Sequence, residues 1–147
     1  MKVTNLKLLA TSDKDLKVIA AHLQDSIVLP KDAANLKKNR IFLIQLNRFM
    51  WEDVEKGVFR KNKRISTILK FDNVISVVSK NIEVNDEKNF LDFLTIESTQ
   101  LPDKSYKIKL IFSGNAAINI SVEVIDVTLD DQGNPWESKT EPRHNFL

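Results

Sequence analysis

The feature that most constrains the fold of this chain is the alternation of apolar and polar residues along many short segments. The clearest case is "YKIKLIF" (106–112), whose Tyr, Ile, Leu and Phe side chains share one face while its lysines share the other. Successive side chains of a β-strand point to opposite faces, so a period of two predicts a strand with one buried face. The segments 40–49 and 65–71 follow the same rule, and the chain is therefore predicted to be rich in short strands.

Short polar links between these segments predict β-hairpins. The dipeptide Asp72–Asn73 separates the strand predicted at 65–71 from "VISVVS" (74–79). A two-residue Asp/Asn link between β-rich segments is a hairpin signal. The tripeptide "SGN" (113–115) predicts a second hairpin, which spans 106–124.

The apolar alternation changes phase near residue 125. Up to Val124 the apolar residues occupy even-numbered positions, and from Ile125 onward they occupy odd-numbered positions. A shift of one residue exchanges the two faces of a strand. We therefore predict a β-bulge or a sharp bend near Val124–Ile125.

One segment near the N-terminus has the period of a helix instead. In "TSDKDLKVIAAHLQD" (11–25), Ser12 is a favourable N-cap and Asp15 completes an approximate capping box. Apolar residues then follow at the spacing that gives a helix one apolar stripe, which predicts that this stripe is buried. The stripe consists of Leu16, Ile19, Ala20 and Leu23.

These elements together predict an α+β fold. About eight short strands form a mostly antiparallel sheet, curled or arranged in two layers, with the single N-terminal helix packed on it. A chain of 147 residues fits one domain, 1–147. Within it we expect a strand and helix (1–25), a β-rich body (26–130) and an irregular C-terminal tail (131–147).

The composition excludes several classes of site. The chain has no cysteine, which excludes disulfides and thiolate metal sites, and its three glycines are too far apart to form a phosphate-binding loop. No signal peptide and no apolar stretch of about 18 residues is present, so we expect a cytoplasmic protein without a membrane span. The common catalytic signatures are absent, which favours a non-enzymatic protein without excluding an enzyme, and we expect no cofactor.

The positive charge of the chain is concentrated in residues 48–64. This segment carries six basic and three acidic side chains, a local charge of +3, whereas the whole chain has a net charge of +2. Basic side chains beside an aromatic residue can meet an acidic partner or a single-stranded nucleic acid. The candidate partner-binding residues are Arg48, Trp51, Arg60, Lys61, Lys63 and Arg64.

The other polar candidates favour structural interpretations. His22 and Asp25 are three residues apart, a spacing that is common by chance, and we expect no metal site there. The adjacent acids Asp130–Asp131 are expected to be turn residues at the end of a strand. Trp136, like Trp51, is expected to attach an irregular segment to the body of the domain.

Three segments carry a resemblance to a known family: "AAHLQDS" (20–26), "NRFMWE" (47–52) and "PWESKTEPRH" (135–144). With them, the chain resembles a family of small bacterial proteins, mainly from alphaproteobacteria, that is classified as a domain of unknown function. The resemblance extends over nearly the whole length. It implies a bacterial cytosolic protein and supplies no reaction, ligand or catalytic residue.

The sequence thus favours a non-enzymatic binding or interaction module that meets an acidic protein or an anionic surface through residues 48–64. Two alternatives stay open. One is a small-ligand-binding protein or enzyme with a pocket between helix and sheet, and the other is a weak RNA or single-stranded DNA binder. The oligomeric state stays open, including self-association through a strand edge.

Overall fold

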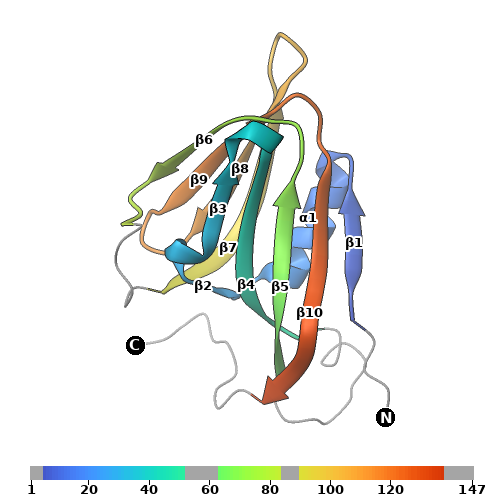
Figure 1. The fold of residues 1–147 in the computed structure, drawn as a ribbon, viewed down its shortest axis with the longest axis vertical. Helices are drawn as coiled ribbons and strands as arrows, with labels where there is room; N and C mark the ends of the chain where they lie inside the picture. Colours follow the sequence, from blue (N-terminus) through green and yellow to red (C-terminus); the bar gives the residue numbers. More distant parts are fainter. Residues whose placement is uncertain (1–4, 52–62, 84–89, 138–147) are drawn as a thin grey trace.

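The structure, a computed structural model, describes residues 5–51, 63–83 and 90–137 (Figure 1). Within these ranges it contains ten strands and one α-helix. Two short 3-10 turns, Pro30–Asp32 and Lys37–Asn39, flank the third strand. The elements are β1 (Lys7–Ala10), α1 (Asp13–Leu23), β2 (Ile27–Val28), β3 (Ala33–Leu36), β4 (Ile41–Phe49), β5 (Lys63–Phe71), β6 (Val74–Lys80), β7 (Leu91–Gln100), β8 (Tyr106–Phe112), β9 (Ala117–Val122) and β10 (Val127–Glu137).

The strands form two layers, which are joined by β2 and, at the start of β6, by a hydrogen bond from the Val74 N–H to the Arg40 carbonyl. The first layer has the order β1-β10-β5-β4, and the second has the order β7-β8-β9-β6. The short strand β2 pairs with both β4 and β7 and so links the layers. All the pairings are antiparallel, which confirms the predicted α+β class. The sheet does not close into a barrel, because β3 and β6 each pair with a single neighbour.

The N-terminal helix forms as the capping pattern predicts. The Ser12 hydroxyl accepts a hydrogen bond from the Asp15 backbone N–H at 3.2 Å, and the Asp15 carboxylate accepts one from the Thr11 N–H at 3.1 Å. The predicted apolar stripe is buried, with Leu16 and Leu23 fully inaccessible. No helix in the described part of the chain is long and apolar enough to cross a membrane.

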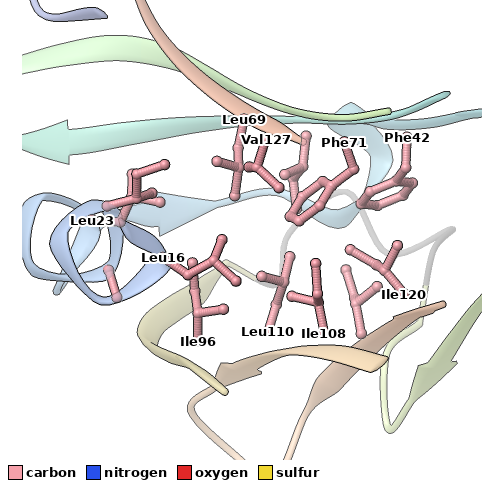
Figure 2. Packing of buried hydrophobic residues seen from close by; sticks show 14 of the residues in the cluster. Leu16, Leu23, Phe42, Leu69, Phe71, Ile96, Ile108, Leu110, Ile120 and Val127 are labelled. Atoms are coloured by element: carbon pink, nitrogen blue, oxygen red, sulfur yellow. The ribbon is translucent and has the colours of Figure 1, made fainter. Parts of the chain in front are cut away.

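The core lies between the two layers and is closed at one end by α1. In Figure 2, Leu69 and Val127 of the first layer point toward Ile96 and Leu110 of the second. Leu16 and Leu23 of α1 lie at one end of this cluster, and Phe42 lies at the opposite end. The helix therefore packs on a filled apolar core.

The predicted hairpin at 65–79 is wrong. β5 pairs with β4 on one edge and β10 on the other, so neither edge of β5 is open to β6. β6 pairs with β9 in the second layer instead. The link Asp72–Asn73 carries the chain across between the layers: the Asp72 N–H donates to the Asp126 carbonyl, and the Asn73 carbonyl accepts from the Glu123 N–H.

The predicted bend near residue 125 is confirmed and has a larger consequence than expected. β9 ends at Val122 in the second layer, and β10 begins at Val127 in the first. Val124 is 52% exposed in the connection, whereas Ile125 is 5% exposed and joins the core. The phase change in the sequence thus marks the point where the chain changes layer, which raises the strand count above the predicted eight. The β8–β9 hairpin at 106–122 is confirmed.

The segment expected to be an irregular tail is partly a strand. β10 continues through Glu137, where Trp136 pairs with Arg64 and Glu137 with Lys63. The register shifts between Gln132 and Trp136, and Gly133 in this interval has φ +68, a conformation that glycine adopts without strain. Residues 138–147 lie outside the described ranges.

Candidate functional site

The structure places Arg48 in the interior of the protein. Its side chain is fully buried and forms a bidentate ion pair with Asp131 of β10, through Nε–Oδ1 at 2.8 Å and Nη2–Oδ2 at 2.7 Å. Asp131 Oδ2 also accepts a hydrogen bond from the Leu6 N–H at 2.9 Å. Asp131 is therefore a buried partner within a strand and not a turn residue, and Arg48 has no surface to offer to another molecule.

The side chain of Arg64 also forms its hydrogen bonds with groups inside the protein. Its Nη1 donates to the carbonyls of Asp25 at 3.2 Å and Asn47 at 3.1 Å, and its guanidinium lies 6.0 Å from the centre of the Phe49 ring. Burial lowers the pKa of Arg64 below its ordinary value, and the nearby Asp25 and Asp92 carboxylates oppose this change. Arg64 contacts the chain just beyond the C-terminus of α1, where the helix dipole favours a cation.

The side chain of Trp51 contacts the same C-terminal end of α1. Its Nε1 donates to the carbonyl of Gln24, the C-cap of α1, at 2.9 Å. Its ring meets Phe49 edge to face at a centroid distance of 4.7 Å. Trp51 and Arg64 therefore hold the start of the 24–26 segment against β4 and β5, which agrees with the expectation that Trp51 attaches its segment to the body of the domain.

Of the remaining candidates of the basic segment, the structure describes one. Lys63 is half-buried at the start of β5. Arg60 and Lys61 lie outside the described residues. The structure therefore brings Trp51 and Arg64 together around Phe49, and it separates Arg48, which faces Asp131, from any surface cluster.

The other polar candidates do not form a site. The Nδ1 atom of His22 is buried and has no hydrogen-bond partner among the described residues. Trp136, which was expected to attach an irregular segment to the body of the domain, lies in strand β10 and is 42% exposed. Within the described ranges, no three side chains of the His, Asp or Glu type come together as metal ligands.

A hollow that the sequence did not predict lies where the two layers stay apart. We call it the seam groove. It is lined by Ala33 and Asn35 of β3, Phe42 and Ile44 of β4, and Val77 and Ser79 of β6, together with further apolar residues, and has a volume of about 190 Å³. It lies at the Phe42 end of the core, away from α1 (Figure 2).

The seam groove exists because two strand edges face it without joining. β3 pairs only with β4, and β6 pairs only with β9, so the two layers have no strand between them on this side. Figure 1 shows β3 and β6 on the side of the sheet remote from β1. Asn35 and Ser79 are the only residues with polar side chains in the described lining, and neither titrates in the physiological range.

One end of the seam groove is cationic. A second hollow of about 290 Å³, lined by Lys37, Arg40 and residues 74–77, shares Asn35 and Val77 with the seam groove. Arg40 forms an exposed ion pair with Glu123, Nη2–Oε1 2.7 Å, and its Nε donates to the Val74 carbonyl at 3.3 Å. We call this second hollow the cationic end.

A sequence signal for this region exists but is weak. The segments 33–36 and 74–80 are short, and in β6 the apolar residues Ile75 and Val78 are 55% and 60% exposed. A strand that leaves apolar residues exposed is a candidate for a sheet edge or an interaction surface. Which two edges face each other depends on the topology, and the local pattern does not contain that information.

The comparisons with known proteins identify the family. A family-wide sequence profile described as "Protein of unknown function (DUF2948)" matches residues 6–144. The comparison with curated proteins and the comparison with solved structures each found no match. The profile covers nearly the whole chain, in agreement with the resemblance carried by the segments 20–26, 47–52 and 135–144. The chain therefore belongs to the DUF2948 family.

Proposed function

We propose that this protein is a non-enzymatic binding module whose seam groove takes up an apolar group of a small ligand. The observation that carries the proposal is the apolar lining of a hollow that opens between two unjoined strand edges. Ligand sites are typically concave and mostly apolar, with a few polar groups that orient the ligand. Asn35 and Ser79 are the polar groups of the described lining.

Burial of apolar surface supplies the affinity in such a site. Each methylene that leaves water contributes about 0.8 kcal/mol. The lining side chains are held by the surrounding structure, since Phe42 and Ile44 belong to the buried core. A preformed site of this kind binds without first ordering its own walls, which limits the entropic cost of binding.

A matched pair of substitutions on β3 tests the proposal. Ala33 lines the seam groove, and its neighbour Ala34 does not. Successive residues of a strand point to opposite faces, so Ala33→Leu fills the groove and Ala34→Leu leaves it open. The probe is 1-octanol, an uncharged molecule with an apolar chain, and the readout is the shift of the backbone amide NMR signals of Val77 and Ser79.

We expect saturable shifts in the unchanged protein and in Ala34→Leu, and binding weaker by about tenfold, or 1.4 kcal/mol, in Ala33→Leu. Circular dichroism verifies that both variants fold. Octanol binding that is absent, or that is equal in the two variants, contradicts the proposal.

A second proposal concerns the basic segment, and the charge excess of residues 48–64 favours it. Arg48 and Arg64 are taken up by internal partners, so an acidic partner would meet Arg60, Lys61 and Lys63. Changing these three residues to serine is expected to abolish binding of an oligoglutamate peptide in a titration at low salt. Unchanged binding refutes the idea, and preferential binding of a single-stranded oligonucleotide supports the nucleic-acid alternative instead.

A further inference from the structure

The seam groove and its cationic end together select a class of ligand. Resting on the proposed function, we propose that the groove binds a free single-chain amphiphile with a carboxylate head, with the chain in the seam groove and the head at Lys37 and Arg40. Three observations carry this assignment: the continuity of the two hollows, the net charge at one end, and the size of the apolar part.

The two hollows adjoin along the seam. Asn35 of β3 and Val77 of β6 line both of them, so a molecule that extends past these two residues reaches the apolar and the cationic part at once. The apolar part lies against core residues of β4, and the cationic part lies at the turn between β3 and β4. A ligand with an apolar body and a polar end matches this order.

The net charge of the cationic end is the charge that neutralises a ligand head group with one negative charge. Lys37 and Arg40 contribute two positive charges, and Glu123, paired with Arg40, contributes one negative charge, which leaves a net charge of +1. None of the described carboxylates pairs with Lys37, whose side chain is exposed. A carboxylate carries one charge at neutral pH, whereas a phosphate monoester carries about −1.5 to −2.

The dimensions and the lining favour a single hydrocarbon chain. The seam groove has a volume of about 190 Å³, whereas sites for drug-sized ligands occupy about 300–1,000 Å³. A hydrocarbon chain needs no hydrogen bonds, and Asn35 and Ser79 are the only polar side chains of the described lining.

The test compares two ligands that differ only in the head group. Octanoate and 1-octanol have the same chain length, so the ratio of their affinities reports the contribution of the carboxylate. An exposed ion pair contributes up to about 1 kcal/mol, and we expect octanoate to bind about two- to fivefold more tightly than octanol at low salt.

The matched variants are Lys37→Gln and Lys38→Gln, two neighbouring exposed lysines of which only Lys37 lines the cationic end. Lys37→Gln is expected to reduce the preference for octanoate toward unity while octanol binding stays the same. Lys38→Gln is expected to keep the preference. These substitutions are at exposed positions, and the thermal unfolding midpoint verifies that the fold is retained.

The possible failures are distinguishable. Equal binding of octanoate and octanol, weakened for both by Ala33→Leu, overturns the carboxylate assignment and leaves the proposed function intact. Loss of all octanoate and octanol binding overturns both. Binding of a peptide with an apolar C-terminus in place of octanoate overturns the amphiphile and assigns the groove to a protein partner.

Discussion

Two regions of this protein carry basic residues, and they use them in opposite ways. At the end of the sheet near α1, Arg48 is fully buried against Asp131, and Arg64 donates to two backbone carbonyls. At the seam, Lys37 is exposed, and the ion pair of Arg40 is open to solvent, with side chains 46% and 56% exposed. The density of charge along the sequence is higher in the first region, yet Arg48 and Arg64 there bond within the protein, whereas Lys37 and Arg40 are exposed.

The comparison teaches that a cluster of basic residues in a sequence is not a measure of a binding surface. An arginine can bury its charge when a carboxylate and backbone carbonyls satisfy its donors. The sequence spacing of Arg48, Arg64 and Asp131 does not indicate this arrangement, because the three residues belong to strands that pair across the sheet. Substitutions can measure the difference between the two regions directly.

The largest expected effect is at the buried ion pair. Arg48→Met removes the partner of a fully buried carboxylate and is expected to lower the free energy of unfolding by about 3–5 kcal/mol. The same substitution at the exposed pair, Arg40→Met, is expected to cost less than about 1 kcal/mol. Urea denaturation monitored by circular dichroism measures the free energy of unfolding of both variants. Similar losses in the two variants would contradict the contrast between the buried and the exposed ion pair.

A double variant separates the charge from the packing at this site. In Arg48→Met combined with Asp131→Leu, no unpaired charge stays buried, and replacing both partners of a buried pair is often close to neutral. We expect the double variant to recover most of the stability lost by Arg48→Met. A double variant that is as unstable as the single one would mean that the shape of the arginine side chain, and not its charge, is what the site requires.

An intermediate effect is expected at Arg64. Arg64→Met leaves the carbonyls of Asp25 and Asn47 without this donor, and an unsatisfied buried acceptor costs about 1–3 kcal/mol. The neighbouring Lys63→Met changes a half-buried lysine and is expected to stay within about 0.5 kcal/mol. Hydrogen exchange at the C-terminal turn of α1 is expected to increase in Arg64→Met alone. Equal stability of the two variants would show that Arg64 does not hold the end of the helix.

The smallest effect on stability is expected at the seam, where a substitution is expected to change ligand binding instead. Glu123→Gln breaks an exposed ion pair, so the free energy of unfolding should change by less than about 0.5 kcal/mol. Because the substitution raises the net charge of the cationic end, octanoate affinity should rise by about twofold at low salt while octanol affinity stays constant. Unchanged octanoate affinity would mean that Arg40 does not contact the head group.

Local patterns predicted most of the elements correctly. The cap formed by Ser12 and Asp15 and the buried stripe of α1 depend on residues within one or two turns of helix, and both are present. The face of β8 that was predicted to be buried is largely buried, with Ile108 and Leu110 in the core. The phase change at Val124–Ile125 correctly marked a bend. The side chains that face the core are apolar both before and after the chain changes layer, so the apolar positions shift where the chain turns.

The errors concern which strands meet. The link Asp72–Asn73 has the composition of a hairpin turn, yet β10 and β4 occupy both edges of β5, and β10 comes from the other end of the chain. The segment 131–137 has glycine and proline and was expected to be irregular, yet β5 supplies it with a partner strand. The seam groove was not predicted for the same reason, since it is a product of edges that stay unpaired.

The sequence by itself determined the kind of most elements, most of the faces that are buried and the class of the fold, because these depend on periodicity and capping over a few residues. The tertiary structure decided the pairing of the strands, and with it the partner of every buried charge and the location of the open seam. Pairing joins residues that are far apart in the chain, such as Arg48 and Asp131, which are 83 positions apart. It also places β3 and β6 on two sides of one groove, although they pair with different strands. Pairing therefore placed the charges of Arg48 and Arg64 inside the protein and left those of Lys37 and Arg40 exposed.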